Sequence, residues 1–114
     1  MPLAWDSFAA FPLLRWQGPE GIVAAFTSRR GGVSEGPFAS LNLGFTTGDD
    51  RAAVAENRRR LCAAVGADPV RTVQIHQVHG AVVHTVGRPG GVQGADGDAL
   101  VSAAEGVALA VFTA

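Results

Sequence analysis

The chain has 114 residues, of which 47% are hydrophobic and 17% are charged. This length and apolar content suit one small domain with a buried core, and they exclude an intrinsically disordered chain. The formal net charge is -1 at pH 7 and all nine basic residues are arginine, so the composition offers no broad basic surface for nucleic acid.

The amino-terminal segment lacks the basic start of a signal peptide and carries Asp6 early. No uncharged apolar run is long enough to span a bilayer. The single cysteine, Cys62, excludes an intrachain disulfide. We therefore expect a cytoplasmic protein with neither a membrane nor a nucleic acid as partner.

The first predicted elements are strands. Residues 13–17 (LLRWQ) are a candidate short strand, and the β-branched apolar run at residues 21–27 (GIVAAFT) predicts a buried strand. A glycine-rich loop, SRRGGVSEGPF, comes next, and the polar segment SLNLGFTTGDD after it is expected to be irregular.

Residues 51–66 (RAAVAENRRRLCAAVG) predict the clearest helix. Asp49 or Asp50 can cap its amino end, where a carboxylate also suits the helix dipole. Gly66 supplies the stop, and Pro69 prevents the helix from resuming.

The helix has one apolar face, formed by Val54, Leu61 and Val65 with the stem of Arg58. Cys62 lies beside this face and is expected to be a small core residue, not a nucleophile. On the opposite face Glu56 stands at ion-pair spacing from Arg59 or Arg60, which predicts a solvated charged surface.

Residues 72–80 (TVQIHQVHG) alternate as a strand does, with His79 on one face and His76 on the other. Further strands are predicted at residues 81–86, 99–102 and 107–113, the last of them buried, with a turn-rich loop at residues 87–98. The order of elements predicts an α+β fold with mixed α/β layers.

His79 is the first candidate for chemistry. Imidazole is a common zinc ligand, and the end of a strand is a rigid support for one. A catalytic zinc needs about three protein ligands. His76 lies on the opposite face of a regular strand, and nothing fixes the register of His84 on the next strand. On these grounds alone the alternative, a polar strand edge followed by a turn, stays open.

The SRRGGVS loop is the second candidate. Its backbone N–H groups and Arg29 or Arg30 could bind an anion, although a surface turn with solvated arginines explains the same residues. Asp96 and Asp98 in the later loop could be carboxylate ligands, but aspartates in turns usually bond their own backbone.

Taken in order, the segments TSRRGGVSEGPFASLNLG, GDD, VAENRRRL, QVHG, GDALVS and ALAVFTA resemble the bacterial YfiH family, also called laccase-domain proteins, polyphenol oxidases or peptidoglycan editing factor. The resemblance runs from about Phe26 to the last residue. It implies a YfiH-like fold, of which residues 1–114 are the amino-terminal part of a single domain.

The resemblance also implies an activity. The resemblance implies a zinc-dependent purine nucleoside phosphorylase whose substrates are adenosine, inosine and methylthioadenosine together with phosphate. It also implies adenosine deaminase activity in the same protein. In deamination zinc can activate a water for attack on the purine C6. A copper-dependent, laccase-like phenol oxidase is the alternative that the older family label implies.

The family site combines a histidine of QxHG with a cysteine of TADC and a histidine of HAGWRG. By resemblance His79 is the catalytic and metal-binding histidine, and Gln77 is the glutamine of its motif. Arg29 matches the arginine of TxRxGG and Asn42 the asparagine of LNLG. With Gly31 and Gly32 these residues are assigned to substrate or phosphate binding, Arg29 and the loop N–H groups being the hypothetical phosphate site.

The chain departs from the family pattern at Thr113–Ala114, where the family continues with Asp-Cys, and Cys62 does not match the missing cysteine. One ligand of three cannot hold a catalytic zinc, so residues 1–114 alone are expected to be inactive. A chain cut in mid-strand could instead be a non-catalytic fragment or pseudoenzyme that self-associates through an unpaired strand edge.

Overall fold

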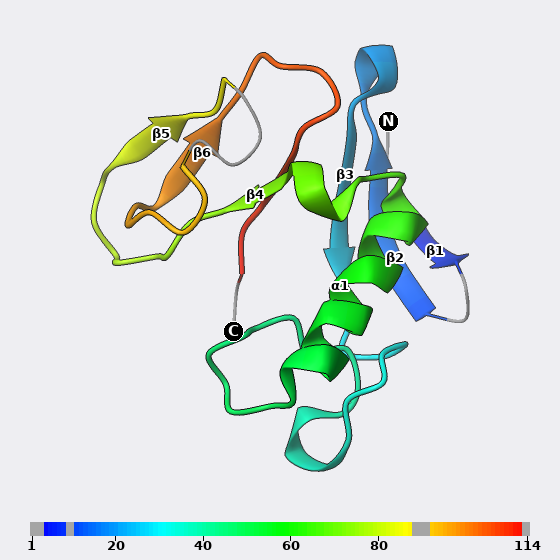
Figure 1. The fold of residues 1–114 in the computed structure, drawn as a ribbon. Coiled ribbons are helices and arrows are strands. Elements are labelled where there is room, and N and C mark those ends of the chain that lie inside the picture. Colours follow the sequence, from blue (N-terminus) through cyan, green and yellow to red (C-terminus); the bar gives the residue numbers. More distant parts are fainter. Residues whose placement is uncertain (1–3, 9–10, 88–91, 113–114) are drawn as a thin grey trace. The chain divides into compact units, whose positions relative to one another are not determined.

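The computed structural model describes residues 4–8, 11–87 and 92–112. These residues form strands, one α-helix and short 3-10 helices, which confirms the predicted α+β class (Figure 1). The chain divides into two compact units, Met1–Val65 and Gly66–Ala114.

An antiparallel sheet forms the first part of the first unit, in the order β1 (Ala4–Phe8), β2 (Phe11–Gln17) and β3 (Val23–Thr27). The short 3-10 helix η1 (Pro19–Gly21) joins β2 to β3, and η2 (Gly36–Phe38) lies in the glycine-rich loop. The predicted strand at residues 13–17 is thus confirmed as part of β2, whereas β1 was not predicted.

The prediction of a buried strand at residues 21–27 is wrong in its burial. Along β3, Val23 and Ala25 are half-buried, but Ala24 is exposed and Phe26 is 61% exposed. An antiparallel sheet can cover one face and leave the other open, so neighbouring side chains of one strand differ in this way. An apolar run does not reveal which face is covered.

The helix α1 (Arg51–Val65) begins and ends as predicted. Asp50 is the capping residue, because its Oδ1 accepts the backbone N–H of Ala52 at 3.1 Å. Gly66 follows the helix with φ of 76°, a conformation that suits a helix stop. Arg15 of β2 donates from Nη1 to the carbonyl oxygen of Ala64 at 3.3 Å, which satisfies one of the last carbonyl groups of the helix.

The core of the first unit lies between β2, the LNLG segment and α1. Its buried residues are Leu13, Leu41 and Ala64, and half-buried apolar residues pack against them: Leu43, Leu61 and Val65. Val54 and Cys62 are also buried. These positions confirm the predicted apolar face of the helix and the expectation that Cys62 is a core residue.

The second unit contains the 3-10 helix η3 (Pro69–Arg71) and two pairs of parallel strands: β4 (Thr72–Gln74) with β7 (Ala108–Ala110), and β5 (Val83–Thr85) with β6 (Ala99–Val101). The predicted strands at residues 81–86 and 99–102 are therefore present but shorter. The strand at residues 107–113 is also shorter and is not buried, since Leu109 is 39% exposed; Thr113 lies outside the described residues.

The predicted strand at residues 72–80 is wrong beyond Gln74. After β4 only His76 makes an isolated bridge, to Asp96, and His79 has φ of 57°. A residue in the left-handed region cannot continue a strand. The placement of His76 and His79 on opposite faces of one strand therefore does not hold. Among the described residues no helix is long and apolar enough to cross a membrane.

Candidate functional site

The backbone of the SRRGGVS loop is held by one serine. Ser40 Oγ accepts the N–H groups of Gly31 and Gly32 at 3.1 and 3.2 Å and donates to the carbonyl oxygen of Arg29 at 3.2 Å. The Arg29 carbonyl also accepts the N–H groups of Ser40 and Leu41 at 2.9 and 2.8 Å. The loop is thus fixed on the LNLG segment, and the N–H groups of Gly31 and Gly32 donate to protein oxygen in this structure.

Asn57 of α1 is the buried centre of the same region, with no exposed surface. Its Oδ1 accepts the N–H of Val33 at 2.8 Å, and its Nδ2 donates to Ser34 Oγ at 2.9 Å and to the Asn42 carbonyl at 2.8 Å. One side chain therefore ties the glycine-rich loop and the LNLG segment to the helix. Sequence reasoning missed it, because a single asparagine beside three arginines resembles any polar helix position.

Gly32 has a packing reason to lack a side chain. A Cβ at this position would lie 2.0 Å from the carbonyl oxygen of Ser40 and 2.5 Å from Asn57 Oδ1. Such distances leave no room for any other residue unless the backbone moves. The second glycine of the loop therefore serves the close approach of the loop to the LNLG segment.

The side chain of Asn42 forms hydrogen bonds through both its nitrogen and its oxygen. Its Nδ2 donates to Thr47 Oγ1 at 2.8 Å and to Asp49 Oδ2 at 3.2 Å, and its Oδ1 accepts the N–H of Gly44 at 3.3 Å. These contacts shape the turn before α1. The role of Asn42 in binding substrate or phosphate stays a prediction.

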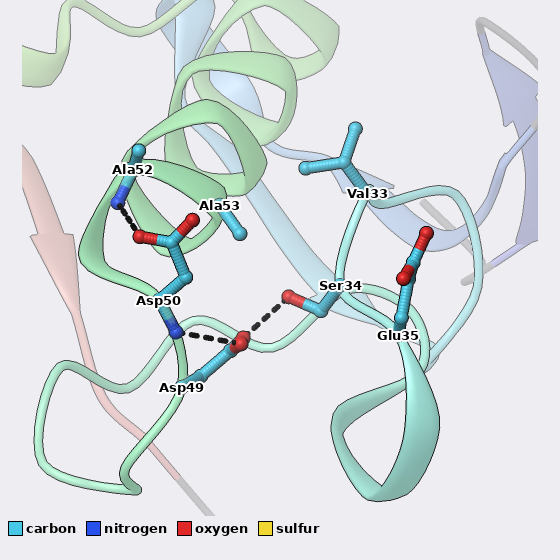
Figure 2. Close-up of a pocket in the computed structure, with 7 residues that line it drawn as sticks. All are labelled: Val33, Ser34, Glu35, Asp49, Asp50, Ala52 and Ala53. Atoms are coloured by element: carbon cyan, nitrogen blue, oxygen red, sulfur yellow. Dashed lines mark hydrogen bonds between the residues drawn. The ribbon is translucent and has the colours of Figure 1, made fainter.

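Asp49 connects this turn to the glycine-rich loop (Figure 2). Its Oδ2 accepts the Ser34 hydroxyl at 2.6 Å, and its Oδ1 accepts the N–H of Asp50 at 2.8 Å. The hydrogen bond from Ser34 lowers the pKa of Asp49 most. Burial, the next largest influence, raises this pKa, and the hydrogen bonds from Asn42 and the Asp50 backbone lower it further, so that the pKa lies below its usual value. Asp49 therefore stays ionised at the amino end of the helix.

A pocket lies between this loop and the start of α1 (Figure 2). Its lining includes three carboxylates, those of Glu35, Asp49 and Asp50, together with Val33, Ser34, Ala52 and Ala53. None of the arginines in the described ranges lines it. The negative lining disfavours phosphate, so the predicted anion site does not coincide with this pocket.

Arg29 and Arg30 are both exposed. The backbone of Arg29 is fixed through its carbonyl, whereas its guanidinium makes no hydrogen bond or ion pair within the described ranges. A side chain that starts from a fixed backbone and remains free at its tip is suited to meet an anion.

The QVHG segment forms a turn after β4. His79 is exposed, has a left-handed backbone and makes no side-chain hydrogen bond with the described residues. Asp98 accepts the N–H groups of Val78 and Gly80 at 3.1 and 2.8 Å. The expectation that the loop aspartates bond their own backbone is therefore wrong for Asp98. Its partners, Val78 and Gly80, precede the loop at residues 87–98 that contains Asp98, so no local sequence pattern indicates them.

The other two histidines have partners of their own. His76 Nδ1 lies 3.0 Å from Asp96 Oδ1, and His84 Nε2 lies 2.8 Å from the Asp96 carbonyl oxygen. In the part of the chain that the structure describes, no three His, Cys, Asp or Glu side chains are placed to hold a metal ion together. His79 thus offers an imidazole without hydrogen bonds to the described residues, and those residues do not complete a metal site around it.

The residues assigned from the sequence fall into both units. Arg29, Gly31, Gly32 and Asn42 come together in the first unit, around the loop that Ser40 and Asn57 hold. Gln77 and His79 lie in the second unit, on one exposed turn.

Comparison with known proteins identifies the family and the relatives of this chain. Residues 23–114 match the family described as multi-copper polyphenol oxidoreductase laccase, and the chain belongs to that family. The crystal structure of YlmD from Geobacillus stearothermophilus is similar, with a TM-score of 0.80 and 38% identity over 95% of this chain and 43% of that one. The YfiH protein of Bacillus licheniformis has a TM-score of 0.78 at 26% identity, covering 92% and 42%. These findings confirm the resemblance to the YfiH family and the YfiH-like fold.

Several curated relatives carry the name purine nucleoside phosphorylase. That of Streptomyces griseus is 50% identical over 95 residues, which are 79% of this chain and 37% of the relative. That of Deinococcus radiodurans is 48% identical over 104 residues, which are 90% and 39%. The chain thus spans about two fifths of the length of these relatives.

Proposed function

We propose that the protein containing this chain is a zinc-dependent, cytoplasmic purine nucleoside phosphorylase that also deaminates adenosine. Its substrates are adenosine, inosine and methylthioadenosine, with phosphate. The names of the relatives support the phosphorolytic activity. The observation that carries the assignment of a site is the exposed imidazole of His79 on a turn whose backbone is held from both sides.

His79 fits the part of one metal ligand. Its ring is accessible and free of hydrogen bonds with the described residues, and its backbone is fixed, so little freedom is lost on binding. The remaining ligands have to come from outside the described residues. When bound, zinc supplies a Lewis acid beside the purine.

Phosphorolysis replaces the bond between the ribose C1′ and the purine nitrogen by a bond from C1′ to a phosphate oxygen. The products are the free base and ribose 1-phosphate, or 5-methylthioribose 1-phosphate when methylthioadenosine is the substrate. Positive charge develops on the ribose as the first bond breaks, and phosphate must be held next to it. Arg29 is the residue proposed to hold phosphate, because its guanidinium is free while its carbonyl is anchored. The proposed role of Gly31 and Gly32 is to let the loop adopt its backbone conformation. Asn42 and Gln77 are proposed to contact the nucleoside.

The description of the family also names copper and phenol oxidation. A copper-dependent oxidase is therefore the second candidate, and imidazole is a good copper ligand. The two candidates differ in metal and in co-substrate. Zinc with phosphate-dependent release of base supports the first, whereas copper with oxygen-dependent turnover of phenols supports the second.

The test uses the full-length protein, the Arg29→Ala variant and the Arg30→Ala variant. Arg29→Ala should raise the KM for phosphate by a factor on the order of 10 to 100, as expected when one charged hydrogen bond is lost. Arg30→Ala is the matched control, since it removes an equal charge from the next exposed position. Equal phosphate KM values in all three proteins would remove Arg29 from the proposed site.

A further inference from the structure

The carboxylate of Asp98 spans the turn that carries His79. Its Oδ1 accepts the backbone N–H of Val78 at 3.1 Å, and its Oδ2 accepts the N–H of Gly80 at 2.8 Å. The two oxygens therefore bind the amide groups of the residues on either side of His79. We propose that Asp98 is the positioning residue of His79, holding the turn that presents the imidazole to its metal. What the imidazole binds rests on the function proposed above.

The turn needs such a partner because of its backbone. His79 has φ of 57°, in the left-handed region that residues with a side chain rarely occupy. A strained conformation persists only where its surroundings determine it. Hydrogen bonds from two N–H groups to one carboxylate are charge-assisted and stronger than bonds to a neutral oxygen. Asp98 therefore stabilises the left-handed backbone of the turn, which the neighbouring residues do not stabilise by themselves.

Asp98 is itself well anchored. Its own N–H donates to the Val82 carbonyl at 3.0 Å, and Ala99, the first residue of β6, donates to the same carbonyl at 3.3 Å. The preceding residue, Gly97, donates to the His76 carbonyl at 2.9 Å. The carboxylate thus projects from the start of β6. Its hydrogen bonds to the turn fix the position of the turn relative to the β5–β6 pair.

Gly80 provides an independent sign that the turn and the carboxylate are fitted to each other. A Cβ at Gly80 would lie 3.2 Å from Asp98 Oδ2, tighter than ordinary contact. A side chain there would push the carboxylate away from the Gly80 N–H. The glycine of QVHG therefore has a role in seating Asp98 beside the histidine.

Asp96 offers a matched control two residues away. It is a carboxylate of the same loop, but its Oδ1 contacts the His76 ring and neither of its carboxylate oxygens bonds the QVHG backbone within the described residues. Asp96→Asn should therefore leave His79 as it is. Asp98→Asn keeps the shape of the side chain but replaces one acceptor by an NH2 group that faces an N–H donor.

The experiment compares the full-length protein with its Asp98→Asn, Asp98→Ala, Asp96→Asn and His79→Ala variants. Zinc affinity is measured by competition with a chelator, well below the melting temperature of each variant. Hydrogen exchange of the Val78 and Gly80 amides is measured by NMR without added metal. Asp98→Asn should weaken zinc binding about 10- to 100-fold, the usual effect of losing an outer partner of a ligand. Asp98→Ala should weaken it at least as much and speed exchange at both amides.

Several results would overturn the proposal. Wild-type zinc affinity in both Asp98 variants would do so, and so would wild-type amide protection in Asp98→Ala. If neither the wild type nor His79→Ala binds zinc, the proposed function fails. Amide exchange then decides alone: fast exchange in Asp98→Ala with Asp96→Asn unchanged supports the positioning role, and unchanged exchange refutes it.

Discussion

His79 combines an exposed imidazole with a backbone that favours glycine. A residue without a Cβ would adopt φ of 57° more readily, by about 1 kcal/mol. Histidine thus occupies a position whose backbone glycine would adopt more easily. Such outliers gather where a protein presents groups for binding or catalysis.

This argument predicts the outcome of two substitutions at one position. His79→Gly and His79→Ala both remove the imidazole, but only His79→Ala keeps the left-handed strain. His79→Gly should therefore be the more stable of the two by about 1 kcal/mol in the free energy of unfolding, measured with denaturant. The opposite order of stability would show that the turn is not strained in solution.

The loop at Gly31 and Gly32 and the helix α1 depend on close packing. Because a Cβ on Gly32 would lie 2.0 Å from a backbone oxygen, Gly32→Ala should destabilise the protein by about 3 kcal/mol, as strongly overpacked sites do. Gly36→Ala is the control: Gly36 has φ of 59° and open space around it, so only the backbone penalty of about 1 kcal/mol applies. Equal losses in thermal or denaturant unfolding would contradict this packing.

The ion pairs on α1 predict a pH dependence. Glu56 accepts hydrogen bonds from Arg59 and Arg60, each at 2.7 Å, and these lower its pKa from 4.5 to about 2, that from Arg59 most. A carboxylate whose pKa is lower when folded stabilises the fold fully above about pH 4.5 and loses this effect as the pH falls to about 2. Glu56→Gln should flatten the curve of unfolding free energy against pH in that window. Parallel curves for the two proteins would refute the assignment.

The helix was predictable because its signals are local: an aspartate cap, an apolar stripe and a terminal glycine. The strands of the second unit were less so. An alternating pattern runs on through His76 and His79, but β4 stops at Gln74, because the following residues bond the loop at residues 92–98 instead of a neighbouring strand. Pairing between distant segments decides where a short strand ends, and periodicity does not report it.

The candidate site was likewise predictable only where its residues belong to local sequence motifs. His79 and Arg29 were found through short motifs, and both are exposed in the structure, as ligand-binding residues must be. Ser40 and Asn57, which hold the arginine loop, were missed, and Asp98 was noted only as a possible ligand or a residue bonding its own turn. Each acts through hydrogen bonds to backbone that is distant in sequence or hidden from any motif. Serine, asparagine and aspartate occur in many loops and helix surfaces, so their identity alone carries little information.

Each unit carries one residue to which a binding role is proposed. The first holds Arg29 on a loop that the helix fixes, and the second holds His79 on a turn that Asp98 fixes. The relatives are more than twice as long as this chain, and their name describes cleavage of nucleosides by phosphate. The activity is therefore proposed for the whole protein that contains this chain, and the metal-binding role of His79 is part of that proposal.

The most direct test measures zinc content and phosphate-dependent release of adenine from adenosine, for the full-length protein and its His79→Ala variant. The wild type should hold zinc in stoichiometric amount and form adenine and ribose 1-phosphate only when phosphate is present. His79→Ala should lose most of the zinc and most of the turnover while staying folded, because the imidazole is exposed and is not part of the core. A wild-type protein without zinc, or a His79→Ala variant with unchanged zinc content and turnover, would contradict the account.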